Sequence, residues 1–193
     1  TAGRGVIHSE LPSDAFQSTG GLMHGFQIWV NLPAKDKMME PRYQDVPTSK
    51  IPIVENEDGL VWAKVIAGKC LGVEAVIDTV IPITYLHLRI QPGGILEQRF
   101  NSTDNVLVFV FSGNTVITHK DGQQNVEDGK LAVFSEGEML NFSNSQDASE
   151  MVDILVLAGQ PINQEVARYG PFVMNTHQEI LQAINDYQTG QLV

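Results

Sequence analysis

The triplet His8-Ser9-Glu10 is the one stretch whose residue types and spacing suit a metal ion. In an extended segment such as residues 6–11, side chains two residues apart share a face, so His8 and Glu10 could reach one ion. An imidazole with a carboxylate suits Fe(II), Mn(II) or Zn(II), and one or two further imidazoles would complete a site with open positions. The triplet alone is unspecific, because a surface His beside a Glu is usually solvated. Both interpretations stay open.

The other candidate side chains show no such arrangement. The remaining histidines are separated in sequence and are expected to be exposed or structurally bonded; they are His24, His87, His119 and His177. A catalytic thiol needs a neighbouring base, and Cys70 has only a lysine beside it, so a half-buried, inert thiol is expected. The sequence contains neither a phosphate-binding loop nor a Gly-x-Ser-x-Gly elbow.

Composition and charge narrow the class of protein. The chain has 193 residues, of which 42% are hydrophobic, enough for one domain or two small ones. A net charge of −11 without a local basic stripe disfavours direct binding to nucleic acid but not to a basic protein. No apolar run is long enough for a membrane span, and a single cysteine suits a reducing compartment. We expect the nucleus and cytoplasm in a eukaryote, and otherwise the cytoplasm.

Short apolar runs separated by Gly, Asn and Asp predict an all-β chain of antiparallel strands. The strands expected are 26–32, 60–67, 83–90, 106–111, 115–119, 131–134 and 152–157. Within 83–90, aliphatic residues alternate with Tyr85, His87 and Arg89, so His87 should point away from the core.

One helix is predicted, near the end of the chain. Thr176 followed by Glu179 forms a capping-box pattern, an apolar stripe follows, and Gly190 is a plausible stop. The sequence therefore predicts a helix over 176–188. Residues 33–52 hold four prolines without helical or strand periodicity and read as a connecting segment.

Six stretches spread along the chain carry a family signature: 1–12 (TAGRGVIHSELP), 24–32 (HGFQIWVNL), 39–44 (MEPRYQ), 65–72 (VIAGKCLG), 158–161 (AGQP) and 169–176 (YGPFVMNT). Together they resemble the pirins, which are bicupins built from two antiparallel β-barrels. The resemblance implies an all-β fold of double-stranded β-helix (cupin) barrels. Residues 1–32 would be the remainder of a first barrel, 33–57 a connecting segment, 58–160 a complete second barrel, and 161–193 an extended segment with a helix.

The resemblance also implies an iron site. In pirins an H-x-H pair on an early strand and a later His and Glu hold the iron, and the later two match His8 and Glu10. The chain begins at Thr1, without Met and without the early pair, and ends at Val193 before the family's tail. We therefore expect a truncated chain that binds Fe2+ or Fe3+ weakly or not at all.

The second barrel is expected to be free of metal. Some positions of this sequence resemble the ligand positions of metal-binding cupins. They hold Gln98, Phe100, Asn141 and Asn144. Amides and a phenyl ring are poor ligands beside imidazole and carboxylate.

Two functions and one inactive alternative follow from the resemblance. Pirins are similar to flavonol (quercetin) 2,3-dioxygenases, in which Glu10 would ligate the metal or, as the catalytic base, take the flavonol hydroxyl proton. They are also redox-sensing nuclear co-regulators that bind Rel-type transcription factors. The third alternative is an inactive truncated remnant. The sequence identifies no substrate-binding residues.

Overall fold

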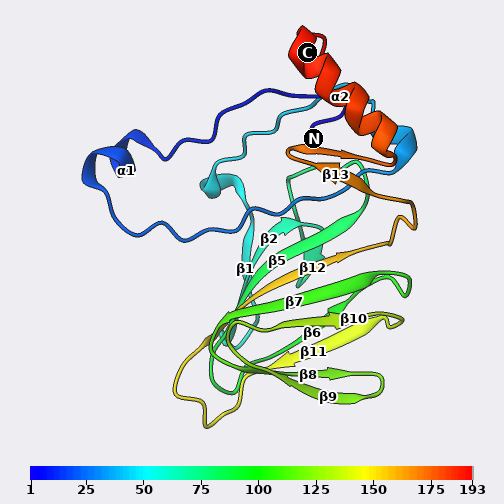
Figure 1. Cartoon of the computed structure of the whole chain (residues 1–193). Coiled ribbons are helices and arrows are strands. Elements are labelled where there is room, and N and C mark those ends of the chain that lie inside the picture. Colours follow the sequence, from blue (N-terminus) through cyan, green and yellow to red (C-terminus); the bar gives the residue numbers. More distant parts are fainter. Residues whose placement is uncertain (193) are drawn as a thin grey trace. The chain divides into compact units, whose positions relative to one another are not determined.

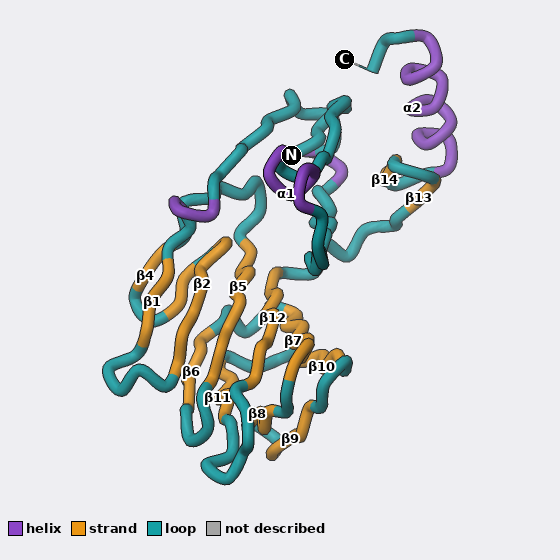
Figure 2. The backbone as a smooth tube through the Cα atoms, turned by 90° about the vertical axis from the view of Figure 1, so that its left-hand side faces the viewer, coloured by secondary structure: helices purple, strands orange, loops and turns teal. Residues whose placement is uncertain are grey.

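The computed structural model describes residues 1–192, which divide into two compact units (Figures 1 and 2). One unit is Gln44–Pro161 and the other joins Thr1–Tyr43 with the described part of 162–193. The first unit is built mainly from strands, whereas the second combines long loops with one hairpin and the helices α1 and α2 (Figure 2). Each unit is described separately below.

A six-stranded antiparallel sheet forms one wall of the larger unit. Its strands follow the order β1-β2-β5-β12-β7-β10. They are β1 (Ile53–Glu55), β2 (Val61–Ala67), β5 (Ile83–Ile90), β12 (Val152–Gly159), β7 (Asn105–Ser112) and β10 (Leu131–Phe134). β5 and β7, which flank β12 in the sheet, are far from it in sequence, so this sheet forms only when distant segments of the chain pair with one another.

A four-stranded antiparallel sheet, of order β6-β11-β8-β9, forms the other wall. It consists of β6 (Ile95–Arg99), β11 (Met139–Ser143), β8 (Thr115–His119) and β9 (Gly122–Val126). A small ribbon of β3 (Lys69–Cys70) and β4 (Val73–Glu74) follows β2. Gly113 makes the turn from β7 to β8 with a φ of +78°, a conformation that L side chains rarely adopt. The all-β prediction is confirmed.

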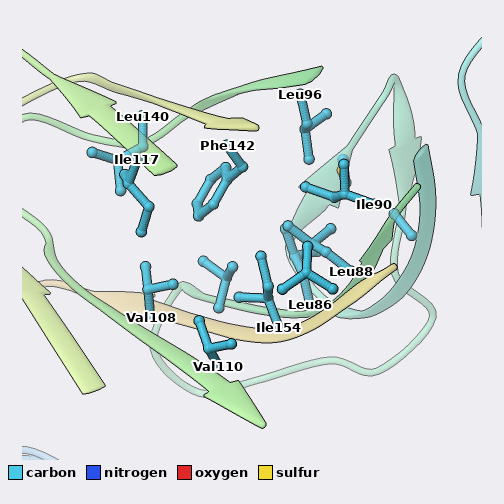
Figure 3. Packing of buried hydrophobic residues seen from close by; sticks show 14 of the residues in the cluster. Leu86, Leu88, Ile90, Leu96, Val108, Val110, Ile117, Leu140, Phe142 and Ile154 are labelled. Atoms are coloured by element: carbon cyan, nitrogen blue, oxygen red, sulfur yellow. The ribbon is translucent and has the colours of Figure 1, made fainter. Parts of the chain in front are cut away.

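The core lies between these two walls (Figure 3). Alternate residues of β5 and β7 point inward, and Leu86, Leu88 and Val108 from the larger sheet are fully buried. Ile117 and Phe142 face them from the smaller sheet and are also fully buried. Period-two alternation puts one face of every strand into this core. The two walls together form the barrel that the sequence predicts.

The residues before the barrel form no strand. Residues 1–52 contain the short helix α1 (Asp14–Thr19) and two 3-10 turns, η1 (Ala34–Asp36) and η2 (Thr48–Lys50), and are otherwise irregular. The predicted strand over 26–32 is therefore wrong, although its residues have strand-forming types. A strand needs a neighbour to accept and donate its backbone hydrogen bonds, and residues 1–52 supply none to this segment.

The helix near the end of the chain is confirmed. α2 (His177–Thr189) begins after Thr176, whose hydroxyl accepts a hydrogen bond from the Glu179 amide, while the Thr176 amide donates to the Glu179 carboxylate. The Thr176 hydroxyl and amide lower the pKa of the Glu179 carboxyl. Gly190 ends the helix with a left-handed conformation. Within its unit, α2 packs on the hairpin of β13 (Ala167–Tyr169) and β14 (Phe172–Met174). No helix within residues 1–192 has the length and apolar character to cross a membrane.

A polar cluster lies on the outer face of the six-stranded sheet. His87 Nε2 lies 2.6 Å from Asp153 Oδ1, and Arg89 Nε donates to the same oxygen at 2.9 Å. The His87 ring is flanked by Trp62 and Phe111, with centroids 5.2 and 5.3 Å away. His87 thus points away from the core, as predicted, but its neighbours leave only 18% of its side chain exposed. Burial lowers the pKa of His87, while Asp153 opposes that shift.

The central position of Phe142 gives the first testable consequence. Its side chain is fully buried between the two sheets, so Phe142→Ala would leave a cavity that the walls cannot fill. We expect a loss of about 3–5 kcal/mol in the free energy of unfolding, measured by urea titration. The exposed Leu131→Ala is the control and should change it by less than about 1 kcal/mol. Equal losses in the two variants would contradict the assigned core.

The lowered pKa of His87 predicts a pH-dependent stability. As the pH falls below the ordinary value of 6.5, the unfolded chain takes up a proton that folded His87 still resists, so acid favours unfolding. The stabilisation is fully present above that value and is lost as the pH falls towards the lower, folded pKa. We expect His87→Gln to reduce the stability difference between about pH 7.5 and about pH 5.5, whereas His177→Gln should leave it unchanged. An unaltered difference in His87→Gln would refute this assignment.

Candidate functional site

His8 and Glu10 come close together in the smaller unit. His8 Nδ1 lies 4.0 Å from Glu10 Oε1, and the two side chains are 43% and 65% exposed. The backbone of residues 6–11 is not a strand, contrary to the expectation that both residues lie on one strand face. Without a neighbouring strand this segment has no ladder to regularise it. The side chains of His8 and Glu10 nevertheless lie close together in this irregular segment.

A close backbone contact holds this segment in place. Arg4 N donates to Met39 O and Arg42 N donates to Thr1 O, both at 2.9 Å. Gly3 lies so near to Met39 that an added Cβ would collide with the Met39 carbonyl oxygen, which explains why a glycine is needed there. An ion pair between Arg4 and Glu40 adds to the same contact. As a result the loop that carries His8 is fixed against residues 39–42.

Two further side chains surround the pair. The ring of Tyr43 lies 6.2 Å from the His8 ring, and Gln27 Nε2 donates to both carboxylate oxygens of Glu10, at 3.1 and 3.3 Å. Our sequence reasoning did not single out Gln27, because 17 residues separate it from Glu10 and no periodicity links them. The only signal was its place within the stretch HGFQIWVNL.

The donor set fits part of a metal site. An imidazole nitrogen and a carboxylate oxygen, both accessible, are donor types that Fe, Mn and Zn accept. Adjacent ligands at about 2.1 Å from a metal lie roughly 3.0–3.4 Å apart, so the two atoms, now 4.0 Å apart, must move closer to share an ion. Within residues 1–192 no group of three or more His, Cys, Asp or Glu side chains is arranged to hold an ion. A metal ion held by His8 and Glu10 would therefore need further ligands besides these two side chains.

The side chains at the expected cupin ligand positions of the larger unit make structural contacts. Gln98 is 7% exposed, and its Nε2 donates to Lys69 O and Arg99 O at 3.1 and 2.9 Å. Asn144 is 4% exposed, and its Nδ2 donates to Ile90 O and Glu150 O. Phe100 packs against the core, and Asn141 pairs with neighbouring strands on β11. The amides of Gln98 and Asn144 thus bond to backbone carbonyls of the larger unit.

The remaining candidate residues stay apart from one another. Cys70 is buried, and this burial raises the pKa of its thiol to about 11, which keeps it protonated and inert. His119 packs against Phe134 beside a small pocket at the end of β8, and His24 packs against Phe26. Within residues 1–192 neither histidine belongs to a group of three or more side chains that could hold a metal ion.

Comparison with curated proteins shows close relatives along the whole chain. The chain is similar to pirin from Homo sapiens, at 35% identity over 191 residues that cover 99% of this chain and 63% of the relative. It is also similar to a pirin-like protein from Solanum lycopersicum, at 38% identity over 99% of this chain and 62% of the relative. The chain thus spans somewhat less than two thirds of the length of these relatives.

Solved structures and a family model agree with this. A quercetin 2,3-dioxygenase from Acinetobacter baumannii is 32% identical, with a TM-score of 0.74 over 85% of this chain and 55% of that chain. A protein from Geobacillus kaustophilus is 29% identical, with a TM-score of 0.62 over 72% of this chain and 54% of that chain. Residues 85–193 match the model of the pirin C-terminal cupin domain. The chain therefore belongs to the pirin family of cupin proteins.

Proposed function

We propose that this chain belongs to an iron-binding dioxygenase of the pirin type that cleaves flavonols such as quercetin. The observation that carries the proposal is the approach of His8 Nδ1 to Glu10 Oε1, at 4.0 Å. A similar protein of solved structure, 32% identical, is a quercetin 2,3-dioxygenase. Fold similarity alone would not support an activity, because one fold hosts many functions.

The two side chains have distinct tasks in this proposal. His8 offers a neutral imidazole nitrogen, and Glu10 offers a carboxylate oxygen to the same ion. When bound, the metal supplies a positive charge that stabilises the flavonolate anion. The Glu10 carboxylate is 65% exposed, so it remains open to accept the hydroxyl proton of a flavonol as a general base.

A second candidate is a redox-sensing co-regulator in the nucleus that binds a Rel-type transcription factor. The net charge of −11 favours association with a basic DNA-binding protein over DNA itself. Pull-down of such a factor by the iron-loaded protein that depends on the iron oxidation state would favour this function. Flavonol turnover would favour the enzyme.

Iron titration tests the metal site directly. We expect the chain of 193 residues to bind iron weakly, because two ligands do not define a coordination geometry. A version extended at the N-terminus by the H-x-H segment of a relative should bind one iron tightly, and His8→Ala in that version should weaken binding at least about tenfold. Binding is measured by competition with a chelator.

The same extended version tests the activity. We expect it to consume quercetin and dioxygen, and Glu10→Gln should reduce the rate by about 10²-fold or more, since an amide is not a base. His177→Gln, in α2, is the matched control and should leave the rate unchanged. Tight, stoichiometric iron binding by the short chain that His8→Ala does not affect would show that the site is assigned wrongly.

A further inference from the structure

The amide of Gln27 faces both oxygens of Glu10. Gln27 Nε2 lies 3.1 Å from Oε2 and 3.3 Å from Oε1, while Oε1 is the oxygen that lies 4.0 Å from His8 Nδ1. An ionised carboxylate only accepts hydrogen bonds, so the amide nitrogen must be the group that faces it. Gln27 therefore bonds both oxygens and fixes the orientation of the carboxylate, with Oε1 beside the imidazole.

We propose that Gln27 is a positioning residue, which fixes the Glu10 carboxylate so that Oε1 and His8 Nδ1 present one pair of ligands to a metal ion. The inference rests on the proposed function, because it concerns the same pair. Partners of metal ligands that donate hydrogen bonds from outside the coordination sphere commonly set the orientation of the ligand. Gln27 does not itself contact the ion in this arrangement.

Gln27 can do this because the segment that carries it is anchored at two further points. Trp29 lies under the guanidinium of Arg168, which is 5.0 Å from the ring centroid. The Asn31 side-chain oxygen accepts a hydrogen bond from Lys37 Nζ at 2.5 Å. Lys37 is only 5% exposed, so its ammonium depends on this contact in place of water.

The three contacts lie close together in the sequence, because they are made by residues 27, 29 and 31. An isolated exposed hydrogen bond contributes little, because ordering two mobile side chains costs about as much as the bond gains. Anchoring by Trp29 and Asn31 removes much of that cost for Gln27. The bond to Glu10 is then held in advance of metal binding.

A double-mutant cycle in the version extended by the H-x-H segment tests the inference, with Mn(II) as the probe. Gln27→Met keeps the length of the side chain and removes its N–H donors. We expect it to weaken Mn(II) binding about tenfold, measured from the EPR signal of the free ion. In a Glu10→Ala background the same change should have no further effect, because Gln27 acts only through Glu10.

A metal-free measurement and a matched control complete the experiment. In the absence of metal, Glu10→Ala should shift the NMR signals of the Gln27 side-chain amide, which a purely remote role would leave in place. Gln123→Met removes an exposed amide on β9 that donates to Thr118, and it should not alter Mn(II) affinity. An unchanged affinity in Gln27→Met, an equal loss in the Glu10→Ala background, or an unshifted amide would each overturn the inference. An extended version with Gln27 and Glu10 intact that binds no Mn(II) would instead refute the proposed metal site, and the inference would fail with it.

Discussion

The structure of the larger unit depends on one constraint, which is that the alternate side chains of two sheets must fill a single apolar core. Leu86, Leu88 and Phe142 lose all contact with water there, and burial of such surface is the main favourable term in folding. Because strands alternate, every residue between two core positions is sent to the outer face. The core therefore also sends His87 and Arg89 to the outer face, where Asp153 pairs with both.

The same constraint determines the hydrogen bonds of two buried amides in this barrel. Gln98 and Asn144 are almost completely covered, so their amides must find hydrogen-bond partners inside the protein. Both donate to backbone carbonyls of neighbouring loops and strands. A histidine at either position could bind a metal but could not make the same two bonds. In this barrel the two amides therefore help to hold the structure together.

The smaller unit is organised by a different balance of forces. Its described residues bury few large side chains, with Ile180 of α2 the clearest case, and its loops are fixed by individual polar contacts. The close approach of Gly3 to Met39, the buried ammonium of Lys37 and the stacking of Arg168 on Trp29 each fix one loop. Segments held by few apolar contacts open at low free energy.

The sequence by itself determined the elements whose signals are local. Period-two alternation defined β5, β8 and β10 to the residue, and the Thr176–Glu179 capping box defined the start of α2, because both patterns come from neighbours along the chain. It missed three strands of the four-stranded sheet, β6, β9 and β11, of which β9 is polar and mostly exposed. It also predicted a strand over 26–32 that has no partner. The motif resemblance identified His8 and Glu10, but only the tertiary structure placed Gln27 against Glu10 and Asp153 against His87. Those contacts join residues 17 and 66 positions apart, and a distance of that kind is decided by how the whole chain packs, which no local pattern records.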